Sequence, residues 1–60
     1  MNRSIDSPLF LIVKTYKSGR VCVAASCRSQ DDADDNFLYL MKVYEDELEQ
    51  GIFRLDVYHL

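Results

Sequence analysis

The longest regular pattern in the chain covers residues 31–50, where hydrophobic side chains recur at intervals of three and four residues. This spacing is typical of an α-helix with one apolar face, because side chains three and four positions apart lie on the same side of a helix. The apolar stripe contains Ala33, Phe37, Leu40, Met41, Tyr44 and Leu48. The pattern therefore predicts an amphipathic helix over residues 31–50 that packs on a core.

Both ends of the predicted helix carry sequence signals. The carboxylates of Asp31, Asp32, Asp34 and Asp35 can cap free backbone N–H groups and interact favourably with the positive end of the helix dipole. Gly51 follows the last turn, and glycine adopts without strain the left-handed conformation that often ends a helix. We therefore expect the helix to begin at the aspartates and to end before Gly51.

Two apolar runs precede the helix. Residues 9–16 and 21–27 are too short for independent helices and contain many β-branched, aromatic and small side chains, so each predicts a strand. Ser18 and Gly19 lie between them and predict a tight two-residue turn, with Gly19 at a positive φ. The resulting register brings four pairs together on one side of the hairpin: Tyr16 with Val21, Lys14 with Val23, Ile12 with Ala25, and Phe10 with Cys27.

In residues 52–58, the apolar side chains of Phe53, Leu55 and Val57 point to one side of an extended chain. The other side carries a mixed set: Ile52, Arg54, Asp56 and Tyr58. This alternation predicts a half-buried third strand. This strand can lie beside the first strand and make an all-antiparallel sheet, or beside the second strand through a right-handed crossover. We favour the first arrangement, because the first strand is the most apolar and suits the central position. The expected fold is α+β, with the order β-β-α-β, a three-stranded, mostly antiparallel sheet and one amphipathic helix packed on one face.

Sixty residues, of which 48% are hydrophobic, are enough for one small domain. We place this domain at residues 8–60 and interpret residues 1–7, which are mostly polar, as a flexible N-terminal arm. A chain of this size buries only about 60% of its unfolded surface, so its stability is marginal unless something such as association supplements the core. The sequence lacks an apolar stretch of about 20 residues and the apolar segment of a signal peptide, so we expect a cytoplasmic protein with no membrane contact.

Few side chains suggest catalytic or metal chemistry. Cys22 and Cys27 lie five positions apart on one predicted strand, so their side chains point to opposite faces and cannot join in a disulfide. His59 is the only histidine, and it stands next to last, where a catalytic base is hard to hold in place. The aspartates of residues 31–35 lack the glycine and the distal glutamate of a calcium loop. We therefore expect no enzyme activity, no catalytic residue, no metal site and no cofactor.

Charge divides the chain into two halves. Residues 1–30 carry five basic side chains and one acidic, a formal +4, whereas residues 31–60 carry nine acidic and two basic, a formal −7. Solvated helix faces and guarded strand edges commonly carry such charges. Two functional alternatives use them. The acidic helix could act as an inhibitor or mimic that occupies a nucleic-acid-binding protein, or the hairpin could bind nucleic acid directly through Lys14, Lys17, Arg20 and Arg28. Net acidity and the lack of a Lys/Arg run argue against direct binding.

A single helix covers only one of the two broad faces of a three-stranded sheet. The other face would expose either Phe10, Ile12, Val21 and Val23 or Leu9, Leu11 and Val13. On the order of several hundred Å² of apolar surface in water costs several kcal/mol at about 25 cal/mol per Å². A second copy of the chain is the simplest cover for such a face.

These observations favour a small, non-enzymatic protein-interaction or regulatory module that acts as a homo-oligomer, most simply a homodimer. A hetero-protein partner on the same surface is the alternative. Leu38, Tyr39 and Val43 project away from the helix stripe, so the interaction surface can include helix as well as sheet. The residues that we expect on this surface are Phe10, Ile12, Lys14, Lys17, Arg20, Val23, Leu38, Tyr39, Val43, Asp46 and Glu49.

Overall fold

The structure is a computed structural model that describes residues 9–60, so the predicted arm over residues 1–7 lies outside the described residues. Five elements follow one another: strand β1 (Phe10–Tyr16), strand β2 (Val21–Cys27), helix α1 (Gln30–Val43), helix α2 (Glu45–Glu49) and strand β3 (Phe53–His59). The strands form one sheet in the order β2-β1-β3, and both pairings are antiparallel. The predicted α+β fold, its β-β-α-β order and the central position of the first strand are confirmed.

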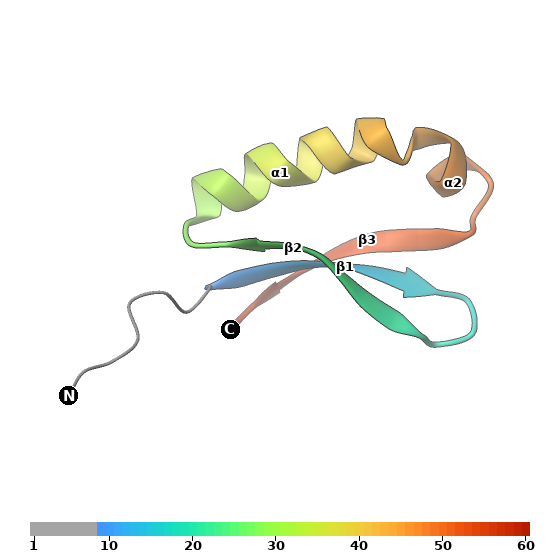
Figure 1. The fold of residues 1–60 in the computed structure, drawn as a ribbon, viewed down its shortest axis with the longest axis horizontal. Coiled ribbons are helices and arrows are strands. Elements are labelled where there is room, and N and C mark those ends of the chain that lie inside the picture. The colour runs from blue at the N-terminus through green and yellow to red at the C-terminus, as the bar shows by residue number, and fades with distance from the viewer. Residues whose placement is uncertain (1–8) are drawn as a thin grey trace.

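The molecule has two layers, because α1 and α2 lie on the same side of the sheet (Figure 1). We call the side of the sheet under the helices the covered face, and the opposite side the open face. Ile12 of β1 is fully buried on the covered face, where it forms a core cluster with Cys27, Ala33 and Leu40. Partly buried side chains complete this core: Phe10, Ala24, Ala25, Phe37, Tyr44 and Leu55.

Three residues, rather than the predicted two, close the hairpin between β1 and β2. The loop consists of Lys17, Ser18 and Gly19. The N–H of Gly19 donates to the carbonyl of Tyr16 at 2.9 Å, and the N–H of Tyr16 donates to the carbonyl of Arg20 at 2.8 Å. The φ of Gly19 is 94°, so the predicted positive φ is confirmed. Three-residue hairpin loops commonly end in such a left-handed residue.

A β-bulge at Ala24 compensates for the extra loop residue. Ile12 faces Ala25, whereas Val13 faces Val23, so Ala24 has no residue opposite it on β1. Before the bulge, the predicted pairs Phe10 with Cys27 and Ile12 with Ala25 are confirmed.

Beyond the bulge, the predicted register is wrong by one residue. Lys14 faces Cys22 rather than Val23, and Tyr16 does not face Val21, which is opposite Thr15. A shift of one residue moves every side chain of a strand to the other face. Cys22, opposite Lys14, therefore shares the covered face with Cys27, opposite Phe10, so the prediction that the two cysteines point to opposite faces is wrong. Val21 and Val23 therefore lie on the open face together with Leu9, Leu11 and Val13, so the structure combines parts of the two predicted sets.

The first helix begins at Gln30 and is capped by a serine. The hydroxyl of Ser29 accepts a hydrogen bond from the N–H of Asp32 at 3.1 Å. Asp31 and Asp32 lie in the first turn, where negative charge is favourable to the helix dipole. The predicted helix start at Asp31 is therefore wrong by one residue, because Ser29, in an extended conformation, is the N-cap in place of the aspartates.

The predicted single helix over residues 31–50 is interrupted at Tyr44. This residue has φ −104° and ψ 24°, outside the helical range, and it separates α1 from α2. Its ring packs edge-on against the ring of Phe53, with 5.3 Å between the ring centres. Within the predicted buried stripe, Ala33 and Leu40 are buried, but Met41 is 44% exposed.

The end of α2 agrees with the sequence signal. Gly51 has a φ of 74°. Its N–H donates to the carbonyl of Leu48 at 3.1 Å, and the N–H of Ile52 donates to the carbonyl of Glu47 at 3.0 Å. These two bonds form a Schellman motif, so the predicted left-handed position of Gly51 after the helix is confirmed.

Candidate functional site

The open face of the sheet carries apolar side chains that neither helix covers. In the centre, Val13 of the central strand β1 is almost fully buried. The side chains around it are about half exposed or more: Leu9, Val21, Val23, Tyr58 and Leu60. Exposed apolar side chains therefore lie on the open face of β2, at the start of β1 and at the end of β3.

Strand β3 brings two charged residues to the open face, opposite Val13 and Thr15 of β1. Asp56 accepts a hydrogen bond from the hydroxyl of Thr15 at 2.9 Å and another from Nε of Arg54 at 3.1 Å. These two donors, with Arg54 the larger influence, hold the pKa of Asp56 below its usual range. The Arg54 side chain is 76% exposed, so the guanidinium can turn towards another molecule.

The outer surface of α1 forms a second exposed apolar group. Leu38, Tyr39 and Val43 are each at least half exposed, as their positions off the helix stripe predict. Met41 and Leu48 line a shallow groove at the junction with α2, together with Lys42 and Glu45. This group lies on the helical layer and is separate from the open face of the sheet.

Lys14 lies among aromatic rings on the covered face. Its Nζ is 5.0 Å from the ring centre of Tyr44 and 5.3 Å from that of Phe53. The rings of Tyr16 and Phe53 are also 5.3 Å apart. Aromatic faces attract a cation through their electron density, so the rings provide a partner for the ammonium under the helical layer.

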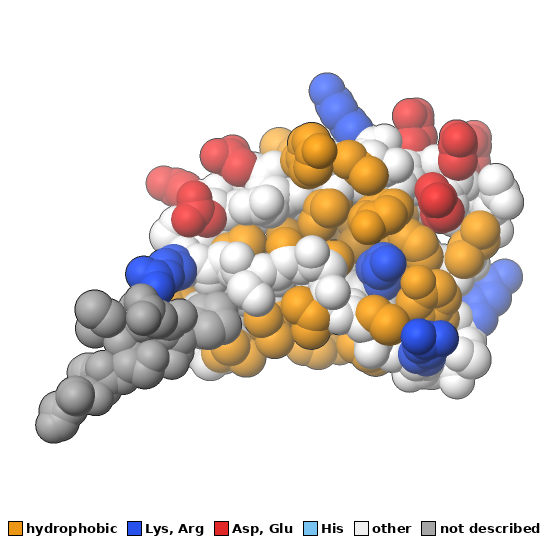
Figure 2. Space-filling model, viewed as in Figure 1, with side chains coloured by type: hydrophobic (Ala, Val, Ile, Leu, Met, Phe, Trp, Pro, Cys, Tyr) orange, Lys and Arg blue, Asp and Glu red, His pale blue; other side chains and the backbone are white. Residues whose placement is uncertain are grey.

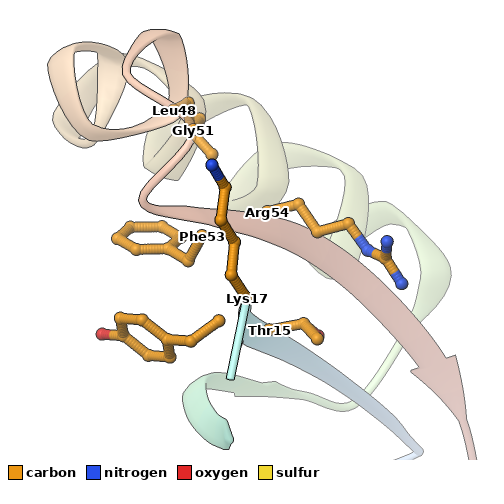
Figure 3. A pocket seen from close by; sticks show the side chains of 7 residues that line it. Thr15, Lys17, Leu48, Gly51, Phe53 and Arg54 are labelled. Carbon is orange, nitrogen blue, oxygen red and sulfur yellow. The ribbon is translucent and has the colours of Figure 1, made fainter. Parts of the chain in front are cut away.

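A groove of about 400 Å³ lies where the hairpin meets the end of α2. Figure 3 shows Lys17 extending towards Gly51 across this groove, whereas Arg54 points away from Lys17. The two cations therefore do not converge on a common point. This arrangement gives no paired basic site for a phosphate or carboxylate.

Charged side chains are distributed by layer. Figure 2 shows acidic side chains over both ends of the helical layer, while most of the basic ones lie over the sheet. The acidic groups follow from the sequence of α1 and α2, which contain eight Asp and Glu residues between residues 31 and 49. The separation predicted from the two halves of the sequence is thus also a separation between layers.

Cys27 and His59 take part in packing. Cys27 is buried in the core cluster, and burial, with the nearby charge of Asp32, raises the pKa of its thiol. A raised pKa lowers the fraction of reactive thiolate. The His59 ring stacks on Phe10, with 4.6 Å between centres. Among residues 9–60, no group of three or more metal-ligating side chains comes together.

The structure distributes the predicted surface residues over several places. Phe10 and Ile12 lie on the covered face, and Ile12 is inaccessible to solvent. Val23 lies on the open face, and Lys17 and Arg20 are exposed at the hairpin. Five others lie on the helical layer: Leu38, Tyr39, Val43, Asp46 and Glu49. Lys14 lies in its aromatic cluster on the covered face. These residues do not converge on one site.

The predicted set omits four exposed apolar residues at the C-terminal strand. Ile52, Val57, Tyr58 and Leu60 are all at least 44% exposed. The alternation of residues 52–58 was the signal for a strand. The favoured sheet order already places this strand at an edge, but the alternation alone does not show which of its apolar side chains the helical layer leaves uncovered.

No family model matches the chain, and neither the curated proteins nor the solved structures contain a significant match. In the part of the chain that the structure describes, no helix is long and apolar enough to cross a membrane.

Proposed function

We propose that this chain is a small, non-enzymatic protein-interaction module that acts as a homodimer. The observation that carries the proposal is the distribution of large hydrophobic side chains between core and surface. In the described residues, six hydrophobic residues are buried, whereas eleven large hydrophobic residues are exposed. Single exposed apolar residues are ordinary, but contiguous groups of them are typical of interaction surfaces.

The size of the chain supports the same proposal. A domain of about 60 residues has little stability to spare, and association adds apolar burial without lengthening the chain. A second copy of the chain is always present wherever the protein is made, and a two-fold contact lets one exposed group cover the same group on the other copy. The exposed groups along a sheet edge are the better candidates, because an edge strand offers unpaired backbone N–H and C=O groups as well as apolar side chains.

Sedimentation equilibrium over a concentration range from nanomolar to about 100 µM tests the proposal. We expect a species of twice the 7.0 kDa chain mass, in equilibrium with monomer at the lowest concentrations. Circular dichroism of the same samples establishes that the chain is folded. A folded protein that stays monomeric through the whole range would overturn the homodimer.

A further inference from the structure

Strand β3 lies at one edge of the sheet, with β1 as its partner in the sheet order. The N–H of Leu60 donates to the carbonyl of Leu9 at 2.8 Å, so the backbone of Leu60 faces β1. Residues that face the partner alternate with residues that face away along an antiparallel strand. Arg54, Asp56 and Tyr58 therefore also direct their backbone groups to β1. The N–H and C=O groups of Phe53, Leu55 and Val57 point outward from the edge.

The two edges of the sheet differ in regularity. All seven residues of β3 pair with β1 in one continuous register. At the opposite edge, the bulge at Ala24 interrupts β2, and bulges hinder pairing with a further strand. A regular, unpaired edge is a template for another strand, so β3 is the edge that can accept one.

We propose, on the basis of the proposed homodimer, that two copies join through their β3 edges. The strands run antiparallel around a two-fold axis at Leu55 and form a six-stranded sheet. Across this contact, each outward-facing residue meets an outward-facing residue, as backbone hydrogen bonding requires. The facing pairs are Leu55 with Leu55, Phe53 with Val57, Arg54 with Asp56, and Ile52 with Tyr58.

Charge selects this register over its neighbours. With the axis at Leu55, Arg54 of each copy faces Asp56 of the other copy, which gives two opposite-charge pairs. The next registers that keep the backbone bonds place the axis at Asp56 or at Arg54, and each then brings two like charges face to face. Like charges directly opposite each other are destabilising, whereas opposite charges contribute favourably.

The apolar side chains at the edge fit the same register. Val57 shares the covered face with its neighbour Ile12, yet it is 44% exposed, because the helical layer does not enclose it. In the dimer it meets Phe53, and an aromatic residue opposite a β-branched one is a favourable cross-strand pair. Ile52 and Tyr58, both exposed in the single chain, face each other across the contact.

Charge reversal at the two positions tests the register. In Arg54→Asp, positions 54 and 56 are both acidic, and in Asp56→Arg both are basic, so each variant places like charges opposite each other in its own dimer. We expect each dimer to dissociate about tenfold more readily than the parent dimer. An equimolar mixture should form the mixed dimer preferentially in native mass spectrometry, because every facing pair is then complementary. The double variant Arg54→Asp/Asp56→Arg should dimerise like the parent.

Two further variants make the result decisive. Arg20→Asp changes the net charge as much as Arg54→Asp does but lies at the hairpin, so it should leave the dimer unchanged. Val23→Lys alters the open face and should also leave it unchanged. If Val23→Lys dissociates the dimer while the charge variants do not, the open face is the contact and the β3 register is overturned, although the homodimer stands. A parent chain that is monomeric overturns both proposals.

Discussion

The Nζ atom of Lys14 lies 5.0 Å from the centre of the Tyr44 ring, at the residue that separates α1 from α2. Lys14 comes from the middle of the central strand, and Phe53 of β3 lies within 5.3 Å of the same Nζ. One cation thus contacts rings from the helical layer and from the sheet. The contact connects the interruption of the helix with the packing of the two layers.

We therefore expect Lys14→Met to reduce stability by about 0.5–1 kcal/mol, the usual contribution of a cation over an aromatic ring at a partly exposed site. Methionine keeps an unbranched apolar stem and removes the charge. Urea unfolding followed by circular dichroism measures the effect. Lys17→Met, in the exposed hairpin loop, is the matched control and should leave the free energy of unfolding nearly unchanged. Equal losses in both variants would show that the rings do not stabilise Lys14.

Leu40 and Leu38 offer a paired test of the helix orientation. Leu40 is buried in the core cluster, whereas Leu38 is 62% exposed only two residues away. Leu40→Ala should cost about 2–5 kcal/mol through lost burial and the cavity that remains. Leu38→Ala should change the free energy of unfolding by less than about 0.5 kcal/mol. Thermal or chemical unfolding of both variants measures the difference, and a reversed order would mean that α1 packs through its other side.

Gly19 tests the hairpin loop. A Cβ atom at this position would meet no atom within 4 Å, so the effect of a substitution comes from its φ of 94° rather than from a clash. Gly19→Val should cost about 1–2 kcal/mol, because side-chain-bearing residues adopt left-handed conformations at this penalty. Gly19→Asn should cost less, since asparagine tolerates this region. The same loss of unfolding free energy for both variants would argue against a left-handed residue here.

Asp56 gives the stability a predictable pH dependence. Hydrogen bonds from Arg54 and Thr15 lower its pKa in the folded chain, while the unfolded chain has the ordinary aspartate value of about 3.9. The stabilisation that ionised Asp56 provides is therefore fully present above about pH 4, and it is lost as the pH falls through the lowered pKa of Asp56. Thr15→Val removes one donor and should weaken this part of the pH profile, as measured by urea unfolding between pH 2 and pH 6. An unaltered profile would exclude the Thr15 contribution.

Local patterns were sufficient to predict the three strands, the main helix and their order along the chain, and the apolar character of the first strand favoured its central position. Helical spacing, apolar runs and two glycines mark the helix, the strands and the turns. Ser29 could also have been identified as the cap, since serine before an acidic helix start is a known N-cap signal. The prediction gave preference to the aspartates, whose dipole interaction favours the same end of the helix.

The bulge and the helix break were not predictable in the same way. Ala24 is one of several small residues in β2, and no local feature distinguishes it as the unpaired one. The three-residue loop and the pairing of Phe10 with Cys27 together require one unpaired residue in β2, and the structure places it at Ala24. The break at Tyr44 involves contacts with Phe53 and Lys14, which are distant in the sequence. The composition of the open face therefore depends on tertiary structure.

The single extra residue in β2 also determines how large an edge-to-edge assembly can become. A sheet with two regular edges can add a strand at each side, so pairing continues from copy to copy and leads to fibres. In this chain, one edge is regular and the other is interrupted at Ala24. In the proposed dimer, pairing through β3 occupies the regular edge of both copies, so growth ends after one step. The bulge at Ala24 would thus restrict the proposed assembly to two copies.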